Sequence, residues 1–245
     1  MKKLLRTSDR ILIYASFLGD FAYDSIKNSS KSRNLHRPAF LLGSSDDGAI
    51  TRTTYRLLKA NSLEKIVKNG KPYLRITPAG WDNFCRDFPL FEFQDKPWNG
   101  YWSVVNYDIP EKERGVRNSL REKLVSLGFG QWKKSVYISP HDFGGDIRDW
   151  VSERELDSYV SVSEARELSF DEKKLVWDVF NLSKISENYD ELLKKYKEGK
   201  IPVGKILQEY FNLLLMDPLL PKELLPNDWL GFKVKKALLG SGKIK

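Results

Sequence analysis

Apolar residues near the start of the chain recur three or four positions apart, which is the spacing of one helical face. The pattern predicts a first helix that begins at Ser8 or Asp9, both helix-capping residue types, and ends near Ile26. A short helix is expected around Pro38–Leu42. After a cluster of turn-forming residues, residues 49–61 are helical again by the same criterion.

A hairpin signal follows these helices. Residues 63–67 and 73–76 have strand-like composition, and Asn69-Gly70 lies between them, a dipeptide typical of two-residue hairpin turns. Thr77 and Pro78 then predict the cap and first position of another helix. Three helices, a hairpin and a closing helix is the order of a winged helix-turn-helix.

The stretch from Tyr101 to Pro140 predicts a strand at 102–107, a helix at 111–127 and a second strand at 135–139. Asp108 is expected to be the N-cap of this helix, and Glu111 its reciprocal capping partner. Beyond Leu168 the apolar spacing is helical. We therefore predict an α+β protein whose three domains comprise residues 1–92, 93–167 and 168–245.

Composition narrows the class of protein. The 245 residues are 41% hydrophobic, enough for packed cores, and Cys85 is the single cysteine, which excludes an intramolecular disulfide. Charged residues interrupt the apolar run near the start, and no segment has the length of a membrane span. These features predict a cytoplasmic protein without membrane association.

Positive charge is concentrated near the start of the chain. Residues 1–80 contain 15 lysines and arginines against 6 acidic residues, a balance of +9, whereas residues 98–165 contain 9 against 11, a balance of −2. Double-stranded DNA is the expected partner of the basic region. The residues that we expect to bind it lie on the 49–61 helix and the hairpin: Arg52, Thr53, Tyr55, Arg56, Lys59, Lys65, Lys68, Lys71 and Arg75.

The sequence gives little support for catalysis or for the binding of a metal or cofactor. His36 and His141 have no companions at metal-ligand spacing, and no phosphate-binding or dinucleotide motif occurs. We therefore predict no catalytic residue, no cofactor and no metal. The tryptophans are expected in cores, although clustered aromatic residues also suit a cavity for a flat or acyl ligand.

Three segments in order resemble PaaX-type transcriptional repressors. The first comprises Tyr55-Arg56-Leu57-Leu58 and Leu74 to Gly80, the second runs from Trp98 to Pro140, and the third is Asp217-Pro218-Leu219-Leu220-Pro221 to Gly231. The resemblance implies a DNA-binding repressor, a homodimer, and an effector of the acyl-coenzyme A type that releases the DNA.

The central segment also resembles the ferredoxin-fold nucleases of CRISPR adaptation. Their signature is an apolar strand ending in Tyr-Asp, here Tyr107-Asp108, then a basic helix, a glycine turn and a Ser-Val-Tyr strand. This resemblance implies a ferredoxin-like βαββαβ-type domain and leaves a metal-dependent nuclease as the alternative, in which Asp108 would bind the catalytic metal.

Overall fold

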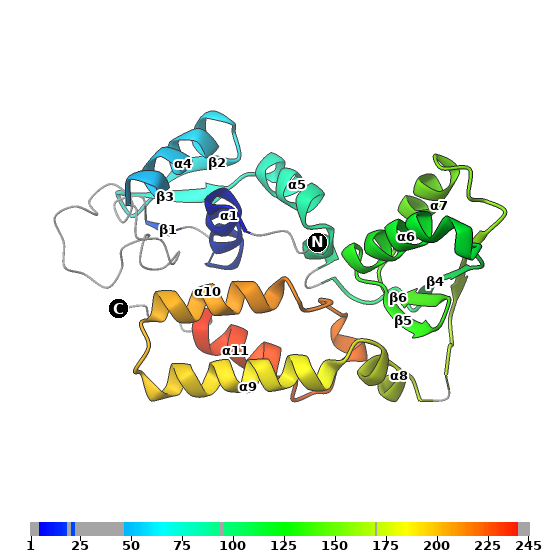
Figure 1. Cartoon of the computed structure of the whole chain (residues 1–245). Helices are drawn as coiled ribbons and strands as arrows, with labels where there is room; N and C mark the ends of the chain where they lie inside the picture. Colours follow the sequence, from blue (N-terminus) through cyan, green and yellow to red (C-terminus); the bar gives the residue numbers. More distant parts are fainter. Residues whose placement is uncertain (1–4, 19–20, 23–46, 94–95, 170, 240–245) are drawn as a thin grey trace. The chain divides into compact units, whose positions relative to one another are not determined.

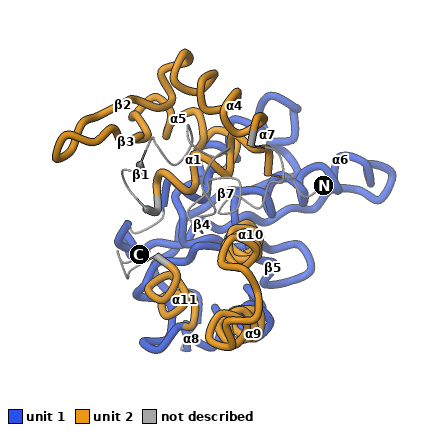
Figure 2. Tube along the Cα trace, turned by 90° about the vertical axis from the view of Figure 1, so that its left-hand side faces the viewer, with its two compact units in different colours: residues 1, 89–185, 217–229 blue, residues 2–88, 186–216, 230–245 orange. Residues whose placement is uncertain are grey.

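The computed structural model describes residues 5–18, 21–22, 47–93, 96–169 and 171–239 (Figure 1). The chain forms two compact units, each built from segments that are distant in the sequence (Figure 2). Unit 1 takes residues 1, 89–185 and 217–229, and unit 2 takes residues 2–88, 186–216 and 230–245. The boundaries expected after residues 92 and 167 stay predictions.

The N-terminal part of unit 2 combines three described helices with a small antiparallel sheet. In chain order its elements are α1 (Thr7–Leu18), β1 (Phe21–Ala22), α4 (Asp47–Lys59), β2 (Leu63–Lys68), β3 (Lys71–Ile76) and α5 (Pro78–Asp87). The strand order is β1-β3-β2, and α1 packs against α4, β3 and α5. The helix expected around Pro38–Leu42 lies outside the described residues.

The first helix is shorter than its apolar pattern predicts. It begins at Thr7, and Phe21 and Ala22, expected to be helical, instead form β1 opposite Leu74 and Tyr73 of β3. The helical extension to Ile26 is therefore wrong at these two residues. An apolar pair satisfies a strand as well as a helix, and here the free edge of β3 supplies its hydrogen-bonding partners.

The predicted hairpin is confirmed. Lys68 pairs with Lys71, and both turn residues have positive φ, 51° at Asn69 and 73° at Gly70, as the two-residue turn requires. The start of α5 is also as predicted, because the Thr77 hydroxyl accepts a hydrogen bond from the N–H of Gly80 at 3.0 Å.

Unit 1 contains the central α+β fold. Its elements in chain order are β4 (Trp102–Tyr107), the 3-10 helix η2 (Glu111–Glu113), α6 (Arg114–Ser126), β5 (Gly130–Lys133), β6 (Val136–Ser139), α7 (Gly144–Ser152) and β7 (Val160–Ala165). The sheet order is β5-β6-β4-β7, and every neighbouring pair is antiparallel. Apart from η2 this is the βαββαβ order of a ferredoxin-like domain. The sequence pattern did not resolve β5 as a separate strand.

One face of this sheet carries the core. Val105 of β4, Leu120 and Leu124 of α6 and Ile147 of α7 are fully buried together. Alternation along β4 places Val105 and Tyr107 on that face, while the helical spacing of Leu120 and Leu124 turns them toward it. Burial of these side chains holds α6 and α7 on the sheet.

The remaining elements are mainly helical and are shared between the units. They are η1 (Pro89–Phe93), α8 (Glu172–Val179), α9 (Leu182–Glu198), α10 (Val203–Leu214), η3 (Lys222–Leu224) and α11 (Leu230–Leu239). In α9 and α10, Tyr189 and Tyr210 are buried in ring contact, and Lys195 bonds Glu209 at 3.1 Å. Within the described residues, no helix has both the length and the apolar character that crossing a membrane requires.

Candidate nucleic-acid interface

Helix α4 has one buried face and one cationic face. Ile50 and Thr54 are almost completely buried, and this inward face follows from their i, i+4 spacing. On the opposite face Arg52, Arg56 and Lys59 are exposed. Tyr55 lies among these cations with 68% of its surface exposed. The helix thus presents guanidinium groups and an aromatic ring to solvent.

Thr53 lies at the margin of this face and is half-buried. Its accessible surface is therefore smaller than that of the neighbouring Arg52 and Arg56. Among the predicted helix residues, Arg52, Tyr55, Arg56 and Lys59 are exposed, whereas Thr53 is only partly so.

The register of the β2–β3 hairpin, called here the wing, divides its cations between two faces. Directly opposed residues share a face, so Lys68, Lys71 and Arg75 lie on one side of the wing. Lys65, opposite Leu74, lies on the other side. All four are exposed. The four predicted wing residues therefore form no single surface, although Lys68 and Lys71 meet at the tip.

Arg75 has a local partner as well. It lies directly across from Glu64, with Nη1 4.0 Å from the carboxylate oxygen, and both side chains are about half exposed. An exposed pair of this kind adds little stability.

Charge over this region is strongly positive. Between Asp47 and Ile76 there are seven lysines and arginines against two acidic residues. Of these acidic residues, Glu64 lies in β2, across from Arg75. A surface of this composition attracts a polyanion in a salt-dependent manner.

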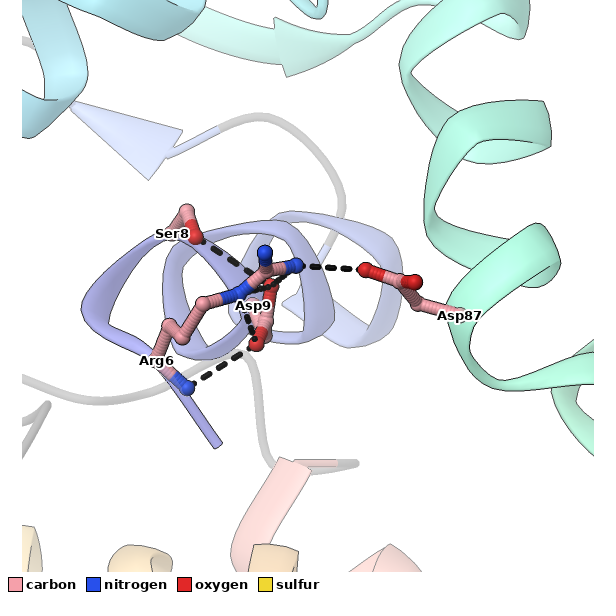
Figure 3. Close-up of polar contacts among 4 residues, drawn as sticks. All are labelled: Arg6, Ser8, Asp9 and Asp87. Atoms are coloured by element: carbon pink, nitrogen blue, oxygen red, sulfur yellow. Dashed lines mark hydrogen bonds and ion pairs between the residues drawn. The ribbon is translucent and has the colours of Figure 1, made fainter. Parts of the chain in front are cut away.

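A polar cluster joins the start of α1 to the end of α5 (Figure 3). The Arg6 guanidinium bonds Asp9 at 2.9 Å and Asp87 at 2.5 Å, and Asp9 also accepts the backbone N–H of Arg6 at 2.9 Å. The bonds to Asp9 raise the pKa of Arg6. Asp9 therefore lies in the first turn of α1 and accepts the backbone N–H of the residue before the helix. It is not the N-cap residue that the sequence predicted. Since α1 packs on α4, the cluster supports the helix that carries the cations.

In the central domain the cap predicted at Asp108 is wrong. Its carboxylate is exposed. The extended Pro110 is the N-cap position of η2, α6 follows with Glu113 at its N-cap position, and neither helix start has a side-chain cap. Glu111 caps nothing either; it pairs with Arg117 at 2.6 Å, and this bond lowers the pKa of Glu111.

The described part of the chain contains no cluster of side chains suited to bind a metal ion. No group of three or more histidine, cysteine, aspartate or glutamate side chains gathers there. His141 is buried 4.9 Å from the ring of Phe93, and its Nε2 bonds the carbonyl oxygen of Pro218 at 3.0 Å. Trp102 and Trp229 are buried, as expected of core residues, whereas Trp177 is exposed and Trp98, Trp132 and Trp150 are only partly buried.

Two family models match the chain. Residues 95–176 match the central Cas2-like domain of the PaaX protein, and residues 180–240 match the C-terminal domain of PaaX-like proteins. Together they cover more than half of the sequence. The chain belongs to the PaaX family.

Membership of the PaaX family agrees with the βαββαβ order of unit 1, because the central model is Cas2-like. A solved structure, uncharacterized protein Rv0674 from Mycobacterium tuberculosis, is similar to this PaaX-family chain with a TM-score of 0.56 and 18% identity, over 97% of this chain and 95% of that one. At this identity the likeness shows the fold alone. No curated protein matches the chain.

The wing exposes one apolar residue to which the sequence analysis gave no role. Val67, at the tip of the wing, is 75% exposed. Because Val67 is apolar, the sequence analysis assigned it to a strand and gave it no role in binding. Val67 is one residue from the turn, and it is exposed although Leu63 and Leu74, on the same face of the hairpin, are buried.

Proposed function

We propose that this PaaX-family chain is a transcriptional regulator that represses genes by binding double-stranded DNA. The observation that carries the proposal is the exposed Arg52, Tyr55, Arg56 and Lys59 face of α4, beside a basic wing. A helix of about 10–12 Å diameter fits the major groove, where arginine recognises guanine edges. The N-terminal part of unit 2 is then a winged helix-turn-helix.

The rest of the proposal concerns assembly and control. A single winged helix covers a short stretch of groove, so two copies on an inverted repeat would supply the affinity that an operator requires. We infer a homodimer that the ferredoxin-like domain holds together. Release by a small-molecule effector of the acyl-coenzyme A type rests on the family resemblance alone.

The experiment is a selection of genomic fragments by the purified protein, followed by mobility-shift titration with magnesium present. Sequence-specific retardation of intact DNA is the expected result. Binding that ignores sequence even in competition with bulk DNA would contradict a regulator, and loss of the DNA itself would favour an enzyme.

A metal-dependent nuclease is the second candidate, and one observation keeps it open. Asp108 is exposed at the end of β4, and its carboxylate forms no hydrogen bond or ion pair with another described residue. The capping role that would have explained this residue is absent. Its backbone N–H bonds Tyr159 at 2.8 Å, which holds its position without using the side chain.

A further inference from the structure

Three arginines lie on one face of α6 in the central domain. Arg114, Arg117 and Arg121 recur at i, i+3 and i+7, the spacing of a single helical face. Arg117 and Arg121 are half-buried, whereas Arg114 is exposed. The Nε of Arg121 donates a hydrogen bond to the hydroxyl of the buried Tyr107 at 2.8 Å. The fold of the domain therefore fixes at least one of these guanidinium groups in position.

A single carboxylate lies among these cations. Two nitrogens of the Arg117 guanidinium donate to the carboxylate oxygens of Glu111, at 2.6 and 3.1 Å. This bond is the main reason that the pKa of Glu111 is lowered, and the charges of Arg114 and Lys134 lower it further. We call Arg114, Arg117, Arg121 and Lys134 the arginine cluster.

Glu111 satisfies this cluster only in part. Its side chain is 75% exposed, and it belongs to η2, a 3-10 helix of three residues. The Nε of Arg117 is buried, and it has no hydrogen-bond partner among the described residues. A buried donor without a partner is unfavourable, and an exposed ion pair adds little stability.

The arginine cluster is confined to a small part of an otherwise acidic domain. Residues 98–165 contain 9 lysines and arginines against 11 acidic residues, and four of those nine cations belong to the cluster. A nucleic-acid strand requires cations along its whole path, whereas a compact group of cations suits one anionic group. A phosphate monoester carries up to two negative charges and three acceptor oxygens, and arginine binds it through two parallel hydrogen bonds.

We propose that the arginine cluster binds the phosphate group of a small phosphate monoester, and that Glu111 takes its place in the ligand-free protein. Arg117 supplies the paired donors, and Arg114 and Lys134 supply charge. Arg121, which Tyr107 orients, supplies a further donor. The phosphate displaces Glu111 because it has the higher charge and the larger number of acceptors. The site uses no residue of the proposed DNA interface, so the two proposals are independent.

The test measures thermal unfolding against the concentration of glycerol 3-phosphate, with sodium chloride added to keep the ionic strength constant. We expect stabilisation that saturates, with a dissociation constant of about 1 mM. A single-stranded oligonucleotide without a terminal phosphate is the second probe, because it offers phosphodiesters only. Circular dichroism establishes that each variant is folded.

Two variants change the site in opposite directions. Glu111→Gln removes the competing charge and should bind glycerol 3-phosphate about fivefold more tightly. Arg117→Lys keeps the charge but loses the paired donors, and it should bind about tenfold more weakly. Glu153→Gln is the matched control, because it removes the carboxylate of another exposed pair, 3.2 Å from Arg154, and should leave the affinity unchanged.

Several results would overturn the inference. Equal affinity in the wild type and Glu111→Gln would show that Glu111 does not occupy the site. An unchanged affinity in Arg117→Lys would place the phosphate elsewhere, and absence of stabilisation would exclude a site altogether. If Glu111→Gln strengthens binding of the oligonucleotide and not of the monoester, the cluster binds nucleic acid instead. None of these results depends on whether α4 binds DNA.

Discussion

His141 donates a hydrogen bond from its Nε2 to the carbonyl oxygen of Pro218, 3.0 Å away. The two residues are 77 positions apart in the sequence, and the bond attaches the segment after α10 to the end of β6 within unit 1. The imidazole packs against the rings of Phe93 and Phe143, whose centroids lie 4.9 and 6.3 Å from its own. Burial lowers the pKa of His141 to about 4 from its ordinary value of 6.5.

This depressed pKa predicts a loss of stability in mild acid. Between pH 6.5 and 4 the unfolded chain binds a proton at His141 that the folded chain does not. The free energy of unfolding therefore decreases as the pH is lowered through this range. The contribution lost between pH 7 and 5 is about 2 kcal/mol. Urea unfolding of the wild type and His141→Gln at both pH values measures it. The variant should lack this component, and an identical pH dependence in both proteins would contradict the prediction.

The arginines of α4 are expected to read bases. Arg52→Ala and Arg56→Ala should each weaken binding to selected DNA by about 1–3 kcal/mol and relax sequence preference, because each removes a bidentate donor. Fluorescence anisotropy with specific and scrambled duplexes measures both effects. Arg86→Ala is the control, since Arg86 is an exposed arginine on α5, outside the face. Unchanged affinity in the Arg52, Arg56 double variant would remove α4 from the interface.

Asp108 separates the regulator from the nuclease. Because its carboxylate caps no helix, Asp108→Asn and Asp108→Ala should both leave the free energy of unfolding within about 0.5 kcal/mol of the wild type. Labelled DNA and RNA, incubated with magnesium or manganese, should stay intact with every protein. Metal-dependent cleavage that disappears in Asp108→Asn would instead establish the nuclease, since an amide lacks the charge that binds a hard cation.

A homodimer on an inverted repeat is the expected DNA complex. Two-fold symmetric proteins bind two-fold symmetric sites whose half-sites are separated by whole helical turns. Sedimentation at micromolar concentration should give twice the chain mass, and footprints should show paired protected segments. A monomer that protects one unrepeated segment would refute the dimer.

Several features followed from the sequence alone, because local chemistry determines them. The turn at Asn69-Gly70 requires positive φ at both residues, and glycine and asparagine adopt it at the lowest cost. Thr77 followed by Pro78 specifies a helix start without help from the rest of the fold. Ile50 and Thr54 turn inward because helical spacing aligns them, which leaves Arg52 and Arg56 outside.

Only the tertiary structure decided the others, because they depend on partners far away in the sequence. Phe21 and Ala22 become a strand since β3 offers them a free edge. Asp108 does not cap the helix it precedes: Pro110 takes the N-cap position of η2, and the backbone N–H of Asp108 bonds the distant Tyr159. The buried bond from His141 to Pro218 joins residues 77 positions apart, so no single segment determines it.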